Sequence, residues 1–162
     1  MRLPDRVHIM EVGPRDGFQI EREFIPTESK VEIVDALSRT GVPEIQVTSF
    51  VHPRATPQMA DAEEVMRRIT RVPGVVYQVL VPNLKGLQRA IPTKPDRVEC
   101  FVSVSESHNR ANSNRSIEDS MRELDQIVAT AKEAGLDVQG GLPTAFGCPF
   151  EGKVPMDRVL DL

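Results

Sequence analysis

An arginine and a carboxylate stand next to each other in a short, glycine-rich segment. The segment Gly-Pro-Arg-Asp-Gly-Phe-Gln at residues 13–19 directly follows the apolar, strand-like residues 7–12. Its two glycines permit backbone angles that other residues resist and its proline fixes one more, so we expect a tight turn that holds Arg15 and Asp16 in a set direction. The carboxyl end of a strand is the functional end of a β/α scaffold. A metal-assisted enzyme would keep its first ligand there.

The composition of the 162-residue chain is ordinary for a soluble globular protein, with 40% hydrophobic and 27% charged residues. No apolar run approaches the roughly 20 residues that cross a bilayer, and no signal peptide opens the chain, so we expect a cytoplasmic protein without a membrane partner. A net charge of -4 with scattered Lys and Arg argues against a nucleic-acid partner. Cys100 and Cys148 form no Cys-x-x-Cys motif, so we expect Cys100 in the core and Cys148 in side-chain packing.

Short β-branched runs alternate with helical patterns along the chain, which is the rhythm of a parallel β/α sheet. No linker or low-complexity tract divides these units, so residues 1–162 are predicted to form one domain. The strands are expected at Val7–Val12, Glu44–Ser49, Val75–Val81, Arg97–Val104 and Leu136–Gly140.

The helical patterns between these runs have recognisable ends. Thr27 is the expected N-cap of the first helix, which Gly41 ends, and Asp61 is the expected N-cap of the second. A third segment runs from residue 83 to 91, and a fourth begins after Ser116 and ends before Gly135 with a clear apolar stripe.

A further periodic segment starts at Pro155 and stops at Leu162, inside its second helical turn. A helix that ends there without a cap is marginal in water. A closed eightfold barrel typically needs about 250 residues. We therefore expect an α/β fold of the (β/α)8 TIM-barrel type, truncated to about the first five βα units, whose open strand edges need a partner.

Polar residues follow every predicted strand and should gather at one end of the sheet. Each alone is more typical of a helix cap, but five converging loops predict a site. These residues are Arg15, Asp16, Gln19, Thr48, Ser49, Asn83, Ser103, Ser105, Glu106 and Thr144.

Six motifs together give the chain a resemblance to the hydroxymethylglutaryl-CoA lyase family. They occur in the family's order and spacing over almost the whole chain, and Glu-Val-Gly-Pro before Arg-Asp-Gly points to this branch of the pyruvate carboxyltransferase-like metallolyases. The motifs are Glu11-Val-Gly-Pro-Arg-Asp-Gly-Phe-Gln19, Thr48-Ser-Phe-Val51, Pro57-Gln-Met-Ala-Asp61, Pro82-Asn-Leu-Lys-Gly86, Phe101-Val-Ser-Val-Ser-Glu106 and Phe146-Gly-Cys-Pro-Phe-Glu-Gly152.

The resemblance implies a metal-dependent retro-Claisen cleavage of a 3-hydroxyacyl-CoA substrate to acetyl-CoA and a keto acid, acetoacetate in the parent reaction of leucine degradation. A divalent ion, Mg²⁺ or Mn²⁺, would lower the pKa of the substrate hydroxyl. Asp16 matches the metal carboxylate, and Arg15 matches the arginine that stabilises the enolate charge. Gln19, Gln46 and Ser105 would contact substrate, and a homo-oligomer is possible. The alternative for Arg15 and Asp16 is an ion pair that only stabilises the turn.

The chain departs from the family pattern in two ways. Many members have Glu where this chain has Gln46, which keeps hydrogen bonding but loses charge. The family completes its metal site with a His-x-His pair and an Asn, and follows with a reactive Cys loop, none of which occurs in these 162 residues. His8 is expected as a partly buried core residue, and His52 and His108 as solvated loop residues. We therefore expect no turnover from this polypeptide alone.

Three functions remain open. The first is a lyase of this family, acting on hydroxymethylglutaryl-CoA or on a different 3-hydroxyacyl-CoA. The second is a catalytically incomplete fragment that pairs its open sheet with another chain. The third, a doubly wound nucleotide-binding domain, is disfavoured because the first βα turn lacks Gly-x-Gly-x-x-Gly.

Overall fold

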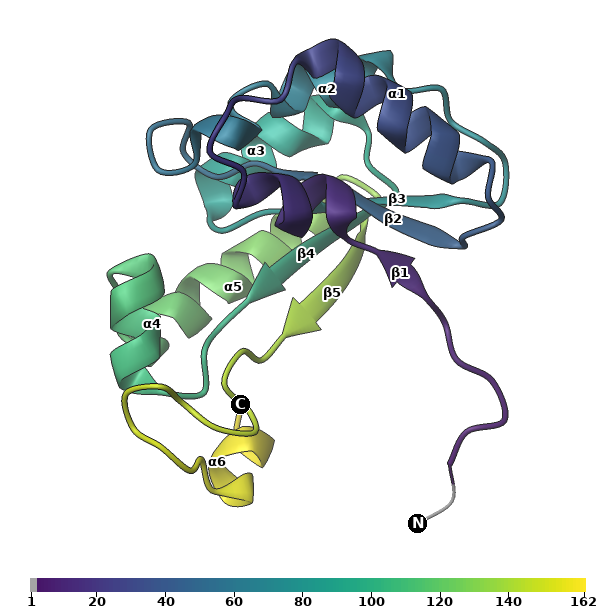
Figure 1. Ribbon diagram of the computed structural model, residues 1–162. Coiled ribbons are helices and arrows are strands. Elements are labelled where there is room, and N and C mark those ends of the chain that lie inside the picture. The colour runs from purple at the N-terminus through teal and green to yellow at the C-terminus, as the bar shows by residue number, and fades with distance from the viewer. Residues whose placement is uncertain (1–2) are drawn as a thin grey trace.

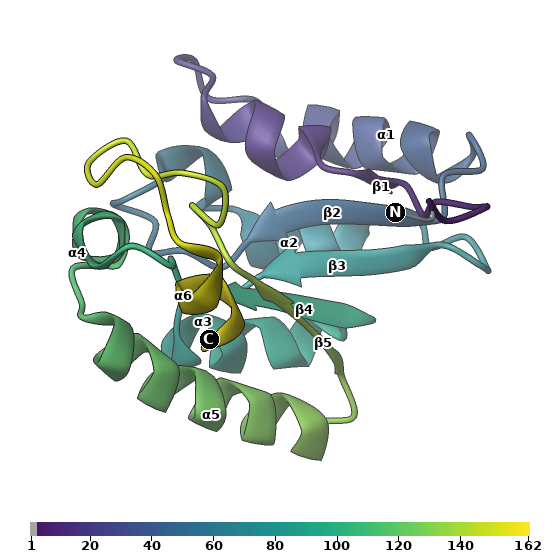
Figure 2. The ribbon, with the colours of Figure 1, turned by 90° about the horizontal axis from the view of Figure 1, so that it is seen from below.

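A parallel sheet whose strands follow one another in chain order organises the molecule. The computed structural model describes residues 3–162. All neighbouring strands are parallel, and Figure 2 shows them fanned out side by side in sequence order. A doubly wound sheet reverses its strand order at a switch point. The described sheet has no such reversal, which excludes the nucleotide-binding alternative. The strands are β1 (Met10–Glu11), β2 (Glu44–Ser49), β3 (Val76–Leu80), β4 (Arg97–Phe101) and β5 (Asp137–Gly141).

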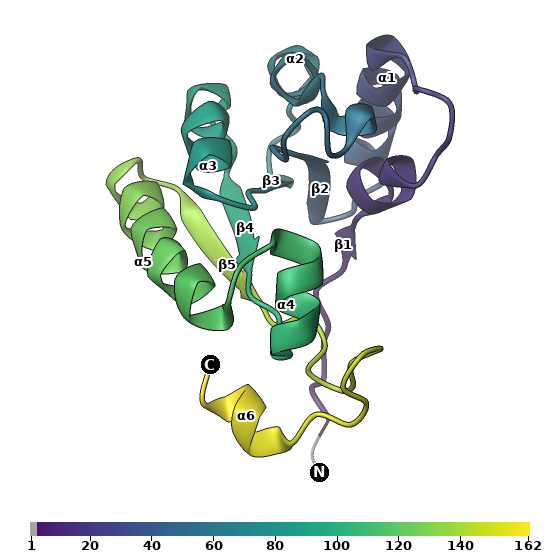
Figure 3. The same ribbon diagram turned by 90° about the vertical axis from the view of Figure 1, so that its left-hand side faces the viewer.

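Helices form an arc outside the curved sheet, as Figures 1 and 3 show. The outer layer contains α1 (Thr27–Ser38), α2 (Ala62–Arg68), α3 (Leu84–Ala90) and α5 (Ile117–Glu133). The helices α4 (Glu106–Ser113) and α6 (Met156–Leu160) lie beyond the carboxyl ends of β4 and β5 instead. Short helical turns complete the chain: η1 (Gly13–Gly17), η2 (Pro57–Met59) and η3 (Ile91–Thr93). Among residues 3–162, no helix has the length and apolar character to cross a membrane.

Strand alternation gives the sheet an apolar face and a polar face. One set of alternate residues, which includes Ile45, Val79 and Val98, is buried in the main core with residues of the outer helices such as Val34 and Ile127. Successive side chains of a strand point to opposite faces, so the other set faces the inner side of the sheet. This second set is unusually polar: Glu44, Gln46, Gln78, Arg97 and Glu99. The inner side therefore carries the charged and amide side chains that can bind a ligand or take part in a reaction.

The first strand is shorter than predicted, because only Met10 and Glu11 pair with β2 and residues 3–9 are exposed. The prediction of a partly buried His8 is wrong for the same reason. Its side chain is 57% exposed, and its Nε2 lies 2.8 Å from Oε2 of the buried Glu44. The other strands start and end within three residues of the predicted positions, and β2 matches in full.

The segment after β1 is a π-helical turn rather than a tight loop. Neither Gly13 nor Gly17 has a positive φ, so the prediction that their backbone freedom shapes the turn is wrong. Gly13 leaves room for the observed position of the Glu11 carboxylate, since a Cβ there would lie 2.9 Å from its Oε1. That carboxylate accepts a hydrogen bond of 2.6 Å from the Gly13 N–H and so ties the turn to β1.

Two of the predicted helix caps are wrong. Thr27 is the first residue of α1, and Asp61 holds the N-cap position of α2 without capping it with its side chain. The Asp61 carboxylate instead accepts hydrogen bonds from Thr27 and Lys30, both at 2.8 Å. The caps at Asn83 and Ser116 are confirmed, each accepting a bond from a backbone N–H in the first turn.

Candidate active site

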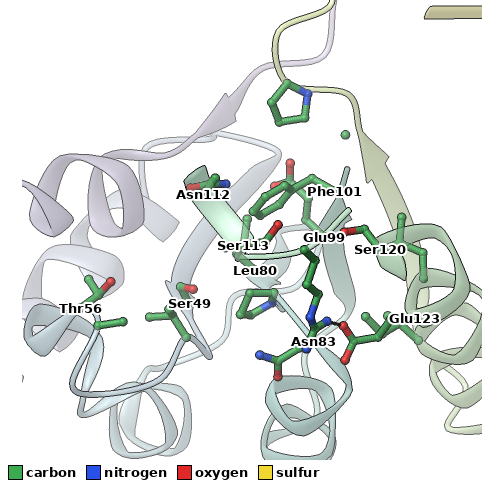
Figure 4. A pocket seen from close by; sticks show the side chains of 18 of the residues that line it. Ser49, Thr56, Leu80, Asn83, Glu99, Phe101, Asn112, Ser113, Ser120 and Glu123 are labelled. Carbon is green, nitrogen blue, oxygen red and sulfur yellow. Dashed lines mark ion pairs between the residues drawn. The ribbon is translucent and has the colours of Figure 1, made fainter. Parts of the chain in front are cut away.

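A pocket of about 810 Å³ lies at the carboxyl ends of the strands. Every strand or the loop after it contributes to its wall, and Figure 4 shows the pocket from close by. Glu99 and Phe101 of β4 lie near its centre, and Ser49 and Thr56 line another side. The predicted convergence of five loops at one end of the sheet is therefore observed.

Arg15 lines this pocket and is held from two sides. Its Nε donates a hydrogen bond to Oε1 of Gln46, and its Nη1 lies 2.6 Å from Oδ1 of Asp16. The Arg15 side chain is 18% exposed, whereas that of Asp16 is 64% exposed and does not line the pocket. The ion pair considered as the alternative is thus present, and it leaves Arg15 directed at the pocket.

Gln46 is fully buried and connects Arg15 to a carboxylate that sequence reasoning missed. Its Nε2 donates a hydrogen bond to Oε2 of Glu99, which lines the pocket from β4. Most predicted site residues follow strands or end them, whereas Glu99 lies within one; Gln46, also within a strand, was predicted only from the family resemblance. Strand alternation was the available signal, because Glu99 pairs in register with Leu80 and Gln139 on the inner face.

Two buried polar side chains near this group have no hydrogen-bond partner among the described residues. Both amide atoms of Gln78 are unpartnered, and Gln78 pairs in register with Gln46. The hydroxyl of Ser49 is also unpartnered, and Ser49 lines the pocket. Buried polar groups are normally satisfied, so a ligand or ordered water fits at Ser49.

Gln19 lies in the pocket wall, whereas Ser105 does not. Ser105 is fully buried, caps α4 by accepting from the His108 N–H, and donates a 2.8 Å hydrogen bond to Glu151. Hydrogen bonds from the Ser107 N–H and the Ser105 hydroxyl, with Arg158, lower the pKa of Glu151 to about 2. The substrate contact of Ser105 stays a prediction, and its observed bonds cap α4 and hold the loop between β5 and α6.

The two remaining histidines lie at the pocket, and the two cysteines are buried in apolar clusters. His52 is exposed as predicted, and it also lines the pocket. The prediction of a solvated loop residue is wrong for His108, because it lies half-buried in α4 at the pocket wall, with its Nδ1 2.8 Å from the Ser103 hydroxyl. Cys100 is in the main core, where burial raises the pKa of its thiol. Cys148 is buried in a second apolar cluster with Val104 and Val154, and its packing role is confirmed.

The described residues do not form a divalent-metal site by themselves. No group of three or more His, Cys, Asp or Glu side chains within residues 3–162 is arranged to hold a metal ion. Asp16 offers one carboxylate, whose Oδ1 already contacts Arg15. Mg²⁺ demands near-octahedral coordination by about six ligands, so one exposed carboxylate does not fit it.

Comparison with known proteins places this site in a family. A family model described as HMGL-like matches residues 6–162. The 3-hydroxy-3-methylglutaryl-CoA lyase, cytoplasmic, of Danio rerio is 46% identical over 158 residues, which are 98% of this chain and 47% of that protein. The hydroxymethylglutaryl-CoA lyase, mitochondrial, of Gallus gallus is 44% identical, over 99% of this chain and 54% of that protein. The chain therefore spans about half the length of the curated relatives it matches.

Solved structures of HMG-CoA lyases are similar to this chain. The HMG-CoA lyase of Bacillus subtilis superposes with a TM-score of 0.95 at 44% identity, over 99% of this chain and 54% of that one. An HMG-CoA lyase from Acinetobacter baumannii, in complex with coenzyme A and 3-methylmalate, superposes with a TM-score of 0.91 at 38% identity, over 95% of this chain and 50% of that one. The prediction of an α/β fold of the (β/α)8 type, represented here by about five βα units, is confirmed. The chain belongs to the HMGL-like family.

Proposed function

We propose that the protein carrying this sequence cleaves hydroxymethylglutaryl-CoA to acetyl-CoA and acetoacetate. The observation that carries the proposal is Arg15, which faces a pocket of about 810 Å³ at the carboxyl ends of the strands and is oriented there by the buried Gln46. Relatives at 43–46% identity that are named as lyases of this substrate support it. Because the chain spans about half of those relatives, the activity is proposed for a polypeptide of the relatives' full length that carries this sequence, called the natural protein below, rather than for residues 1–162 alone.

The reaction needs a group that stabilises negative charge. A base takes the proton of the 3-hydroxyl, and its oxygen forms the carbonyl of acetoacetate as the bond between C2 and C3 breaks. The electron pair of that bond passes to the thioester enolate, which takes up a proton to give acetyl-CoA. A permanently charged guanidinium is suited to bind the enolate oxygen. Arg15 uses its Nε for Gln46 and one Nη1 hydrogen for Asp16, and its Nη2 has no partner among residues 3–162. We assign Nη2 to the enolate oxygen.

Gln19 is proposed as a substrate contact, because it lines the pocket beside Arg15. Gln46 is proposed to act through Arg15 rather than on substrate, since it is fully buried. Asp16 remains a proposed ligand of Mg²⁺ or Mn²⁺. The described residues alone do not make that site.

A different 3-hydroxyacyl-CoA is the second candidate substrate. The observation that favours it is Glu99, which places a carboxylate in the pocket wall. Coenzyme A recognition is proposed by analogy with the Acinetobacter baumannii lyase, whose complex contains coenzyme A. The relatives are named as both cytoplasmic and mitochondrial, and the cytoplasm remains our proposal for this protein, as does a homo-oligomer.

The test is an assay of acetoacetate release from hydroxymethylglutaryl-CoA with Mg²⁺ or Mn²⁺. The natural protein should turn over, and the 162-residue polypeptide should not. Turnover by the 162-residue polypeptide above a protein-free blank would contradict our account of its incomplete metal site. Turnover of another 3-hydroxyacyl-CoA in preference to this one would select the second candidate.

A further inference from the structure

We propose that Glu99 is a positioning residue for Arg15, and that it acts through the amide of Gln46. The inference rests on the proposed function, which gives Arg15 its task. It adds a carboxylate on β4 to the residues that set the direction of the guanidinium.

The amide of Gln46 has a forced orientation. Its Oε1 accepts from the Arg15 guanidinium, and its Nε2 donates to the Glu99 carboxylate. A flipped amide would direct N–H groups at the guanidinium and a carbonyl at the carboxylate, so both contacts would be repulsive. Glutamine at position 46 therefore connects a cation and an anion. Glutamate at this position could not, because a glutamate side chain has no N–H to donate to Glu99.

Glu99 is the hydrogen-bond acceptor on which this orientation depends. Gln46 is fully buried, so an unbonded Nε2 would be costly. The neighbouring Gln78 takes no part, since neither of its amide atoms has a hydrogen-bond partner among residues 3–162. Charged ends also polarise the amide between them, which strengthens the bond to Arg15.

The sheet leaves room for the Glu99 carboxylate. On the neighbouring strand β5, a Cβ at Gly141 would lie 3.3 Å from Oε1 of Glu99. Glu99 is partly buried in the pocket wall, next to Phe101 (Figure 4). Its other oxygen, Oε2, is the one that Gln46 contacts. Gln46 therefore holds Oε2, and the missing side chain at Gly141 leaves space beside Oε1.

The test is a charge swap in the natural protein. Gln46→Glu alone sets two carboxylates against each other, and Glu99→Gln alone removes the charge that fixes the amide. The double variant moves the carboxylate to position 46, where it accepts from both Arg15 and the amide introduced at position 99. We expect kcat to fall about 100-fold in Gln46→Glu and about 10-fold in Glu99→Gln, and to recover to within about 5-fold of the parent in the double variant, because contacting residues couple.

Two readouts separate positioning from a structural role. KM should change by less than about 3-fold throughout, since the effect is on transition-state charge. The exposed Gln88→Glu and Glu133→Gln are matched controls that repeat the same substitutions on α3 and α5, and they should leave kcat unchanged. A double variant whose kcat equals the product of the single effects, or a Glu99→Gln variant with parental kcat, would overturn the proposal.

Failure of the proposed function would be visible separately, because the parent protein would then release no acetoacetate. The parent, the two single variants and the double variant would in that case be compared by urea unfolding. A departure from additivity of at least about 3-fold in the unfolding equilibrium constant would support the coupled unit. Additive effects would overturn it.

Discussion

Replacement of Lys30 by Met should destabilise the wall of the pocket more than any exposed ion-pair mutation. The Lys30 side chain is 5% exposed, and its Nζ lies 2.8 Å from Oδ1 of Asp61, whose side chain is 12% exposed. The same Nζ donates to the backbone carbonyl of Gln58 and lies 4.3 Å from the centroid of the Phe24 ring. These contacts tie α1 to the segment after β2, which also supplies Thr56 to the pocket.

The magnitude follows from the charge that Lys30→Met leaves behind. Removing one partner of a buried pair costs about 3–5 kcal/mol, because the other charge stays buried without compensation. Asp61 keeps its 2.8 Å hydrogen bond from Thr27, so we expect the low end, about 3 kcal/mol in the free energy of unfolding. For a domain of this size that corresponds to a Tm lower by roughly 6–12 °C.

The assay is urea unfolding followed by far-UV circular dichroism, with Arg68→Met as the control. Arg68 of α2 pairs with Glu28 of α1 and with Glu64 of α2 at the exposed surface, where water and salt screen the charges. No measurable change in the free energy of unfolding is therefore expected for Arg68→Met. A loss below about 1 kcal/mol in Lys30→Met would refute the assignment of a desolvated, uncompensated Asp61.

Three further predictions concern packing, pH and metal. Gly86→Ala should lower the free energy of unfolding by about 2 kcal/mol, because the new Cβ would lie 2.8 Å from the Phe50 carbonyl oxygen. Gly17→Ala is the control, since nothing lies within 4 Å of a Cβ at that position and its φ is not positive. Equal urea midpoints for Gly86→Ala and the parent would contradict the close approach. The depressed pKa of Glu151, about 2, predicts stability that is fully present above the ordinary value of 4.5 and is lost as pH falls towards about 2. The Tm difference between parent and Glu151→Gln should therefore shrink over that interval, and a constant difference would count against it. In the natural protein, Asp16→Asn should weaken Mn²⁺ binding by at least about 10-fold in a titration followed by electron paramagnetic resonance. Asp125→Asn, at an exposed position, is the control and should leave the Mn²⁺ affinity unchanged. Unchanged Mn²⁺ affinity in Asp16→Asn would reject the ligand role of Asp16.

The sequence predicted those features that depend on local chemistry. The run Glu44–Ser49 is β-branched and bounded by turns, and β2 has those limits. Asn83 and Ser116 cap their helices because each side chain reaches a backbone N–H in the first turn, which is a local event. The alternation of strand and helix patterns was enough to predict the parallel sheet.

The predictions that failed concern features that depend on contacts between residues distant in the sequence. Asp61 has the side chain of a cap, but its carboxylate accepts hydrogen bonds from Lys30 and Thr27 of α1 and none from a backbone N–H of α2. Helix α4 was not predicted, since its residues are almost all polar and it forms after the buried cap Ser105. Arg15 was identified from its own motif, whereas Glu99 required the register of β4 against its neighbours. Local patterns therefore located the site, and cross-strand contacts completed it.

The most direct measurement compares acetoacetate release by the natural protein and its Arg15→Lys variant. Lysine keeps the positive charge but loses the planar fork that contacts Gln46 and Asp16 while leaving Nη2 for the enolate. Our account predicts that the parent cleaves hydroxymethylglutaryl-CoA, and that Arg15→Lys lowers kcat by at least about 100-fold at a nearly unchanged Tm. Parental kcat in Arg15→Lys would contradict it.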